Sequence, residues 1–312
     1  MRSRHDLQRR LFRCGYAVAL AALLAGCGGS GGKAPSDGLP RLDFGYDTSA
    51  PLHYVDRGRI NKASYPIAIR DVSFSSTGRT IQAYLLVPPG SKRRPAVVFV
   101  HGSGGDRSEL LGEAASLAGR NVVTLTITAP SASVTSTPRT LDGLLAQARS
   151  LTVNDVVAVR RAVDLLQSLP TVDPDRIGYV GWSAGARLGA VVAAAEPRIK
   201  ALVLVSAGAD PLSAFVAQAP VRARSRVRTV LGSVDPLRYI AWARPGSLLL
   251  EDGRRDEVVP QSALQNIARA APSGTTVRWY DAQHALNRKA YDDAFAWLAT
   301  KLPIDGPRMR GA

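Results

Sequence analysis

The five residues Gly181-Trp-Ser-Ala-Gly185 constrain the fold of this 312-residue chain more than any other feature. A strand-like stretch (residues 175–181) leads into them, and a run of small residues (184–195) follows. In a G-x-S-x-G arrangement the serine lies on a sharp strand-to-helix turn with its hydroxyl exposed. Both glycines are needed because the turn is crowded and a Cβ at either place would clash. The segment therefore predicts a strand, a tight turn at Ser183 and a helix.

Strand-like and helical patterns alternate along the chain. Strand-like runs occupy residues 68–75, 80–87, 95–100, 122–127, 177–181, 201–205, 248–251 and 276–280. The first two flank a short turn and predict a hairpin. Between most of the later runs apolar residues recur at helical spacing, as in residues 156–166. Alternation of this kind predicts an α/β fold with a mainly parallel sheet covered by helices on both faces.

A serine nucleophile needs a base that takes its proton, and histidine titrates in the right range. The chain has four histidines. His5 lies in the N-terminal segment, His53 in an irregular stretch, and His101 in a His-Gly motif after a strand. Only His284 follows the last strand and precedes the terminal helix, so it is the predicted base for Ser183.

These features resemble the α/β-hydrolase superfamily over about residues 66–303. The resemblance rests on the G-x-S-x-G turn, on His101-Gly-Ser-Gly-Gly105 after a strand, and on the chain order serine, acid, histidine. It implies a mainly parallel eight-stranded sheet with helices on both faces and a small cap. The Asp-x-x-Arg-Ile-Gly entry to the strand before Ser183 is similar to the dienelactone-hydrolase-like and prolyl-oligopeptidase-like branch. True dienelactone hydrolases carry cysteine at the nucleophile position, whereas this chain carries serine.

The third catalytic residue orients the imidazole and stabilises its charged form. The run Gly253-Arg-Arg-Asp-Glu-Val-Val-Pro260 has the Gly-x-x-Asp…Pro pattern of the resembled family, which implies Asp256. Other carboxylates in this part of the chain compete for the role. They are Glu251, Asp252, Glu257 and Asp235.

An oxyanion hole needs backbone N–H groups aimed at the developing charge. The resemblance implies one from Ala184, the residue after the nucleophile, and one from the loop after His101. The second donor is predicted to be Ser103, with Gly104 as the alternative. His101 is predicted to hold this loop rather than to act as a base.

Motifs for metals and nucleotides are missing from the sequence. No His/Cys cluster has zinc spacing, and no Walker sequence or G-x-G-x-x-G fingerprint is present. We therefore expect neither a metal nor another cofactor.

The N-terminus predicts export. A basic segment and a short apolar run end in Leu24-Ala25-Gly26-Cys27, which resembles the lipobox of bacterial lipoproteins. The resemblance implies a signal peptide over residues 1–26, lipidation of Cys27 and anchoring to the cell envelope. A plain signal peptide with an incidental cysteine is the alternative. Residues 27–65 then form a lipidated linker and N-terminal wrap, 66–303 the hydrolase domain, and 304–312 a tail.

Two segments are longer than ordinary connections: residues 129–150 and 207–246. In the resembled superfamily such insertions cap the active site. The second contains four arginines between Arg222 and Arg228, which predict either a contact with an acidic or phosphorylated substrate or a solvated face. The net charge is +15, but the basic residues are scattered and aromatic residues make up only 6%, so nucleic acid is not an expected partner.

Together these features predict a serine hydrolase that cleaves a carboxylic ester at the cell envelope. A peptidase or thioesterase would use the same residues, so small esters and short peptides are both expected substrates. A catalytically silent fold that serves as a binding lipoprotein is a third hypothesis, since fold alone does not guarantee activity. The sequence predicts no oligomeric state.

Overall fold

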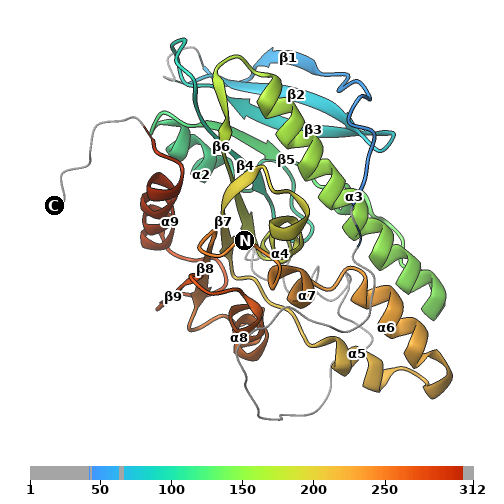
Figure 1. Ribbon diagram of the computed structural model, residues 1–312. Helices are drawn as coiled ribbons and strands as arrows, with labels where there is room; N and C mark the ends of the chain where they lie inside the picture. Colours follow the sequence, from blue (N-terminus) through green and yellow to red (C-terminus); the bar gives the residue numbers. More distant parts are fainter. Residues whose placement is uncertain (1–41, 43, 63–66, 305–312) are drawn as a thin grey trace, which may run out of the picture.

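A computed structural model describes residues 42, 44–62 and 67–304 (Figure 1). The predicted signal peptide, Cys27 and most of the C-terminal tail lie outside these residues. The chain forms one nine-stranded sheet in the order β1-β2-β3-β5-β4-β6-β7-β8-β9. The pairs β1–β2, β2–β3 and β3–β5 are antiparallel, and the remaining pairs are parallel. The strands are β1 (Val55–Arg59), β2 (Ile69–Ser76), β3 (Arg79–Leu86), β4 (Arg94–Val100), β5 (Val123–Ile127), β6 (Val172–Trp182), β7 (Ile199–Val205), β8 (Leu248–Gly253) and β9 (Thr276–Tyr280).

The predicted α/β class and mainly parallel sheet are confirmed, but the sheet has nine strands rather than eight. The additional strand is β1, which lies in the stretch predicted to be irregular. Its side chains are mostly exposed, so it carries no alternation of apolar and polar residues. Pairing with β2 and two ion pairs hold it at the edge: Arg57 with Asp71 at 3.2 Å and Arg70 with Asp56 at 2.6 Å.

Helices cover both faces of the sheet (Figure 1). They are α2 (Leu111–Ala118), α3 (Leu141–Ser168), α4 (Ala184–Ala195), α5 (Leu212–Gln218), α6 (Arg224–Gly232), α7 (Pro236–Ile240), α8 (Gln261–Ala270) and α9 (Arg288–Lys301), with short 3-10 turns η1 (Pro130–Ser133) and η2 (Val221–Ala223). Alternate side chains of β4 enter opposite layers, because successive residues of a strand point to opposite faces. Val98 packs in the layer that contains α3, α4 and α8, and Phe99 packs in the layer that contains α2 and α9.

The two predicted cap segments meet at one end of α3. Residues 141–150 are the first turns of this 28-residue helix. Residues 207–246 fold into α5, η2, α6 and α7, and Val216 and Val227 form an apolar cluster with Leu145 of α3. Their role as a cap stays a prediction.

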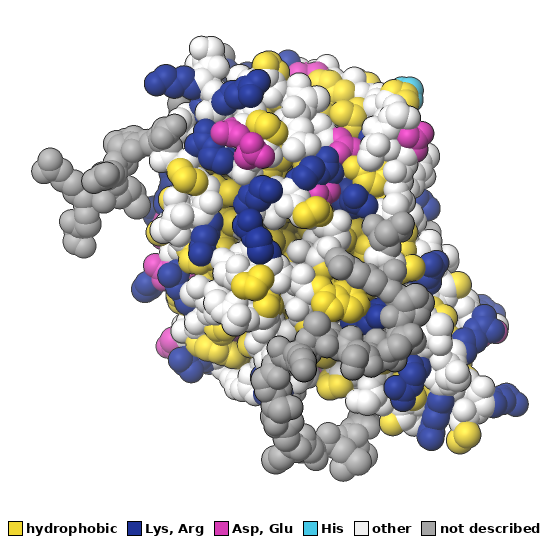
Figure 2. Space-filling view, in the orientation of Figure 1, with side chains coloured by type: hydrophobic (Ala, Val, Ile, Leu, Met, Phe, Trp, Pro, Cys, Tyr) yellow, Lys and Arg dark blue, Asp and Glu magenta, His cyan; other side chains and the backbone are white. Residues whose placement is uncertain are grey.

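The arginine run lies on η2 and α6 and faces solvent. Figure 2 shows Lys and Arg side chains gathered over α5 and α6 at the lower right of the molecule. Arg226 pairs with Asp142 at 3.2 Å, and both side chains are more than half exposed. In the part of the chain that the structure describes, no helix combines the length and apolar character needed to cross a membrane.

The fold predicts a large difference between two leucines of α3. Leu166 is fully buried, whereas Leu141 is 36% exposed. Leu166→Ala should lower the free energy of unfolding by about 2–5 kcal/mol, because it removes core contacts and leaves a cavity. Leu141→Ala should change it by less than about 0.5 kcal/mol. Urea denaturation measures both, and equal effects would contradict the assigned packing.

Candidate active site

Ser183 lies on the turn between the central strand β6 and helix α4. Its φ is 55° and its ψ is −110°, a conformation that non-glycine residues rarely adopt. The turn closes only around glycines. A Cβ added to Gly181 would lie 2.5 Å from the backbone of Gly185, and one added to Gly185 would overlap the carbonyls of Val100 and His101. These contacts explain the G-x-S-x-G spacing physically and fix the position of the Ser183 hydroxyl.

The structure brings the three predicted catalytic side chains together. His284 Nε2 lies 2.9 Å from Ser183 Oγ, and His284 Nδ1 lies 2.8 Å from Asp256 Oδ2. Each residue comes from a different loop at the carboxyl end of the sheet: Ser183 after β6, Asp256 after β8 and His284 after β9. Ser183 and His284 are each 7% exposed, and the Asp256 side chain is fully covered. Such a chain of hydrogen bonds can transfer a proton from the serine to the imidazole.

Asp256 is held in its ionised form. Its burial alone would raise the pKa, but the hydrogen bond with His284 and those from the backbone N–H groups of Val259 and Val258 lower it more. Asp256 Oδ1 accepts the two backbone bonds at 2.8 and 2.9 Å. The net pKa of Asp256 lies below the usual aspartate range, so at neutral pH this carboxylate faces the imidazole as an anion.

The competing carboxylates are placed elsewhere. Glu251 and Asp252 are buried in β8, where Tyr280 donates a 2.9 Å hydrogen bond to Glu251. Burial raises the pKa of Glu251 to about 8 and that of Asp252 to about 7. Asp235 accepts a hydrogen bond from the backbone of Leu237 and caps α7. Glu257 is exposed.

The predicted oxyanion donors lie on two neighbouring segments. Ala184 is the first residue of α4, so its N–H has no partner within the helix and lies at the positive end of the helix dipole. Ser103 and Gly104 are exposed on the loop after β4. The Gly185 N–H donates to the His101 carbonyl at 3.1 Å, which joins this loop to the serine turn. Which loop N–H faces the oxyanion stays a prediction.

His101 holds the loop from inside. Its Nδ1 lies 2.6 Å from the Gly102 carbonyl, and its Nε2 accepts a 3.0 Å hydrogen bond from the N–H of Ala129. Because Nε2 is an acceptor, the proton resides on Nδ1 and the ring is neutral. Burial lowers the pKa of His101, which agrees with this neutral state.

Three side chains that the sequence did not single out surround the site. The Trp182 indole and the Ser206 hydroxyl both donate to the backbone carbonyl of His284, at 3.1 and 2.9 Å. The Glu109 carboxylate accepts from the N–H of Gly102 at 2.7 Å. Trp182 stands at the variable position of the serine motif. No rule of sequence spacing assigns Ser206 or Glu109 to the catalytic site. They meet the site only because parallel strands end at a common edge.

Part of the chain matches the model of a known protein family. The acetyl xylan esterase family (AXE1) matches residues 58–207, a range that includes Ser183 but neither Asp256 nor His284. No curated protein matches the sequence.

Solved structures match over most of the chain. The acetyl xylan esterase from Paenibacillus sp. is 21% identical, with a TM-score of 0.67 over 81% of this chain and 90% of that one. Acetyl xylan esterase 1 from Thermoanaerobacterium sp. is 19% identical, with a TM-score of 0.66 over 81% and 89%. A cold-adapted esterase from an Arctic intertidal metagenomic library is 19% identical, with a TM-score of 0.59 over 77% and 97%. The chain is a hydrolase of the α/β-hydrolase type.

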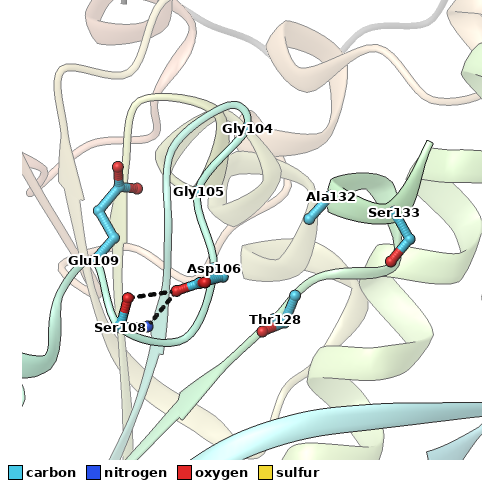
Figure 3. Close-up of a pocket in the computed structure, with 8 residues that line it drawn as sticks. All are labelled: Gly104, Gly105, Asp106, Ser108, Glu109, Thr128, Ala132 and Ser133. Carbon is cyan, nitrogen blue, oxygen red and sulfur yellow. Dashed lines mark hydrogen bonds between the residues drawn. The ribbon is translucent and has the colours of Figure 1, made fainter. Parts of the chain in front are cut away.

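The hydrolase has an open hollow of about 510 Å³ beside the loop after β4 (Figure 3). Its lining is polar and consists of Gly104, Gly105, Asp106, Ser108, Glu109, Thr128, Ala132 and Ser133. Ala132 contributes the single apolar side chain of this lining, apart from the glycines. Among residues 42, 44–62 and 67–304, no group of three His, Cys, Asp or Glu side chains is placed to hold a metal ion.

Asp252 gives this hydrolase a pH-dependent stability. In the folded chain burial and the neighbouring charge of Asp256 raise its pKa to about 7, whereas an unfolded aspartate has a pKa of about 3.9. The folded state therefore retains a proton that the unfolded state has lost. The contribution of Asp252 to the free energy of unfolding is fully present below about pH 4. It falls as the pH rises towards about 7, by up to about 1.4 kcal/mol per pH unit.

Asp252→Asn removes this titration. The difference in free energy of unfolding between Asp252→Asn and the unmodified chain should rise from pH 4 to pH 7 and level off by pH 8. Asp175→Asn, at an exposed position, is the control and should show no such rise. Urea unfolding at a series of pH values measures the effect, and a difference independent of pH would contradict the assigned burial of a protonated Asp252.

Proposed function

We propose that this hydrolase cleaves a carboxylic ester through a covalent acyl-enzyme formed on Ser183. The observation that carries the proposal is the continuous hydrogen-bonded chain from Asp256 through His284 to Ser183. A hydroxyl is a weak nucleophile by itself, and this chain supplies both the base and the anion that stabilises the base once it is protonated.

The reaction has two steps. Ser183 Oγ attacks the carbonyl carbon of the ester while His284 Nε2 takes the hydroxyl proton. The resulting oxyanion is stabilised by the N–H of Ala184 and by that of Ser103 or Gly104. Collapse breaks the bond to the alcohol, which leaves with the proton from His284. Water, deprotonated by His284, then attacks the acyl-enzyme, and the carboxylic acid departs as Ser183 recovers its proton.

A short acyl group on a polar alcohol is the substrate class that the hollow beside the predicted oxyanion loop favours, although Ser183, Asp256 and His284 do not line that hollow. Two carboxylates, three hydroxyls and the backbone of two glycines line the hollow beside the oxyanion loop, and they provide hydrogen-bonding partners rather than apolar surface. Two of the similar solved structures are acetyl xylan esterases, and the matching family bears the same name. An acetyl ester is therefore the first substrate to test, with thioesters and peptides as comparisons.

Ser183→Ala should abolish hydrolysis of p-nitrophenyl acetate, because it removes the attacking oxygen. Asp256→Asn should lower kcat by about 10³–10⁴-fold, since the neutral amide no longer stabilises a positively charged His284. Glu257→Gln, at the next and exposed position, is the control and should keep most of the activity. Full activity in Asp256→Asn would contradict the assigned acid.

Covalent labelling separates an enzyme from a silent fold. A fluorophosphonate should label Ser183 in the unmodified chain and fail to label Ser183→Ala. Absence of labelling together with absence of turnover on acetyl esters, thioesters and peptides would leave a binding lipoprotein as the function.

We also propose that the chain is exported and anchored to the cell envelope by lipid on Cys27. The support is the basic segment, the short apolar run and the Leu-Ala-Gly-Cys sequence that ends it. Two or three acyl chains hold a protein on a membrane durably.

Metabolic labelling with a fatty acid analogue tests the anchor. The unmodified chain should incorporate the label, and Cys27→Ser should lose it together with membrane association. Cys14→Ser is the matched control and should behave like the unmodified chain, because residue 14 would be removed with the signal peptide. Labelling that persists in Cys27→Ser would contradict the anchor.

A further inference from the structure

Glu109 lies against the loop that is predicted to supply an oxyanion donor. It stands just before α2, and its carboxylate returns to the start of the same loop, where Oε2 accepts from the N–H of Gly102 at 2.7 Å. Figure 3 shows Glu109 on the segment that leads away from Gly104 and Gly105. An ionised acceptor forms a stronger hydrogen bond to a backbone N–H than a neutral one. The contact therefore ties one end of the loop to the other.

The loop is glycine-rich where this carboxylate sits. A Cβ on Gly105 would overlap the Glu109 carboxylate. A Cβ on Gly102 would lie 3.0 Å from the Trp182 ring and 3.4 Å from Glu109 Oε2. Gly102 thus packs closely against both Trp182 and Glu109, and the lack of a side chain at Gly105 leaves room for the Glu109 carboxylate. By contrast, a Cβ on Gly112 of α2 would meet nothing within 4 Å.

The residues that contact or adjoin Gly102 also contact both His284 and the serine turn. Trp182 precedes the nucleophile, and its indole N–H donates to the carbonyl of His284. The centroids of the Trp182 and His284 rings lie 5.3 Å apart. His101, which precedes Gly102, is bonded to the N–H of Gly185 on the serine turn. A displacement of Gly102 would therefore move the following residue, Ser103, relative to Ser183.

The titratable and polar groups around Glu109 come from four segments: the loop after β4, α2, the loop after β9 and α9. Glu109 is exposed overall, but the partial burial of its carboxylate against the loop raises the pKa, and the N–H of Gly102 opposes that rise. Asp106 on the same loop and Glu113 on α2 raise the pKa further, while His284 lowers it. Tyr291 on α9 also faces this group. The hydrogen bond from Gly102 thus lowers the pKa of Glu109 more than His284 does.

We propose that Glu109 is a positioning residue that holds the loop of residues 101–105 in the shape the oxyanion requires, with Gly105 present to admit its carboxylate. The proposal rests on the proposed function, because it assigns Glu109 a part in the same acyl transfer. Glu109 acts through Gly102 and takes no part in bond making. Its contribution is expressed in the transition state, where the oxyanion first forms.

The test compares kcat and KM of the full-length protein on p-nitrophenyl acetate. Glu109→Ala should lower kcat by about 10–100-fold and change KM by less than about 3-fold, because the loop N–H contacts the oxyanion and not the ground-state ester. Glu109→Gln should retain kcat within about 3-fold, since its amide oxygen can accept from Gly102. Glu113→Ala, one turn further along, is the matched control and should leave both constants unchanged.

A second pair of variants tests the room left for the carboxylate. Gly105→Ala should reproduce the loss of kcat seen in Glu109→Ala, because the added methyl group displaces the carboxylate. Gly112→Ala adds the same methyl group in open space and should have no effect. Loss of kcat in Glu109→Gln equal to that in Glu109→Ala, or full activity in Glu109→Ala or Gly105→Ala, would overturn the proposal.

Hydrogen–deuterium exchange provides a readout that does not depend on turnover. The segment containing Gly102 should exchange faster in Glu109→Ala than in the unmodified chain, and at the unmodified rate in Glu109→Gln and Glu113→Ala. Unchanged exchange in Glu109→Ala would overturn the proposal even if the protein is an esterase. A different outcome would reject the proposed function and retain the loop contact. In that outcome Glu109→Ala exchanges faster than the unmodified chain, but the unmodified chain hydrolyses no ester and does not differ from Ser183→Ala.

Discussion

The close approach of two backbone segments around Ser183 is the constraint on which the site depends. Gly181 and Gly185 touch across the turn, and Gly185 also lies against the carbonyls of Val100 and His101 at the end of β4. The hydrogen bond from Gly185 to His101 joins the nucleophile to the neighbouring loop. Because β6 is flanked by β4 and β7, this contact is made in the interior of the sheet, where the surrounding structure can maintain a strained serine conformation.

Carboxyl groups only a few residues apart are driven to different ionisation states by their surroundings. Asp256 receives two backbone hydrogen bonds and the imidazole of His284, and its pKa is lowered. Asp252, four positions earlier, is buried beside the charge of Asp256, and its pKa is raised to about 7. Asp256 is therefore the anion that faces the imidazole, whereas Asp252, which does not contact the imidazole, retains its proton up to a higher pH.

The position of His284 depends on contacts with its backbone as well as its ring. Trp182 and Ser206 donate to its carbonyl from the ends of β6 and β7, so the loop after β9 is attached to the strand that carries the nucleophile and to its neighbour β7. Ser206 itself has a φ of 55° and is fully buried. Neighbouring parallel strands thus end in two strained serines, one carrying the reactive hydroxyl and the other supporting the base.

The sequence by itself determined the strand-turn-helix at Ser183, the class of the sheet and the pairing of Ser183 with His284, while it left several carboxylates competing for the third place. Local rules suffice there, because glycine spacing, apolar periodicity and chain order are visible in one dimension. The edge strand β1 was missed because exposed residues paired only along their backbone leave no apolar pattern. Only the tertiary structure decided that Asp256, with its backbone donors, faces His284, and that Glu109, Trp182 and Ser206 hold the surrounding loops. Those contacts join residues far apart in the chain, and they exist only once the strand ends lie side by side.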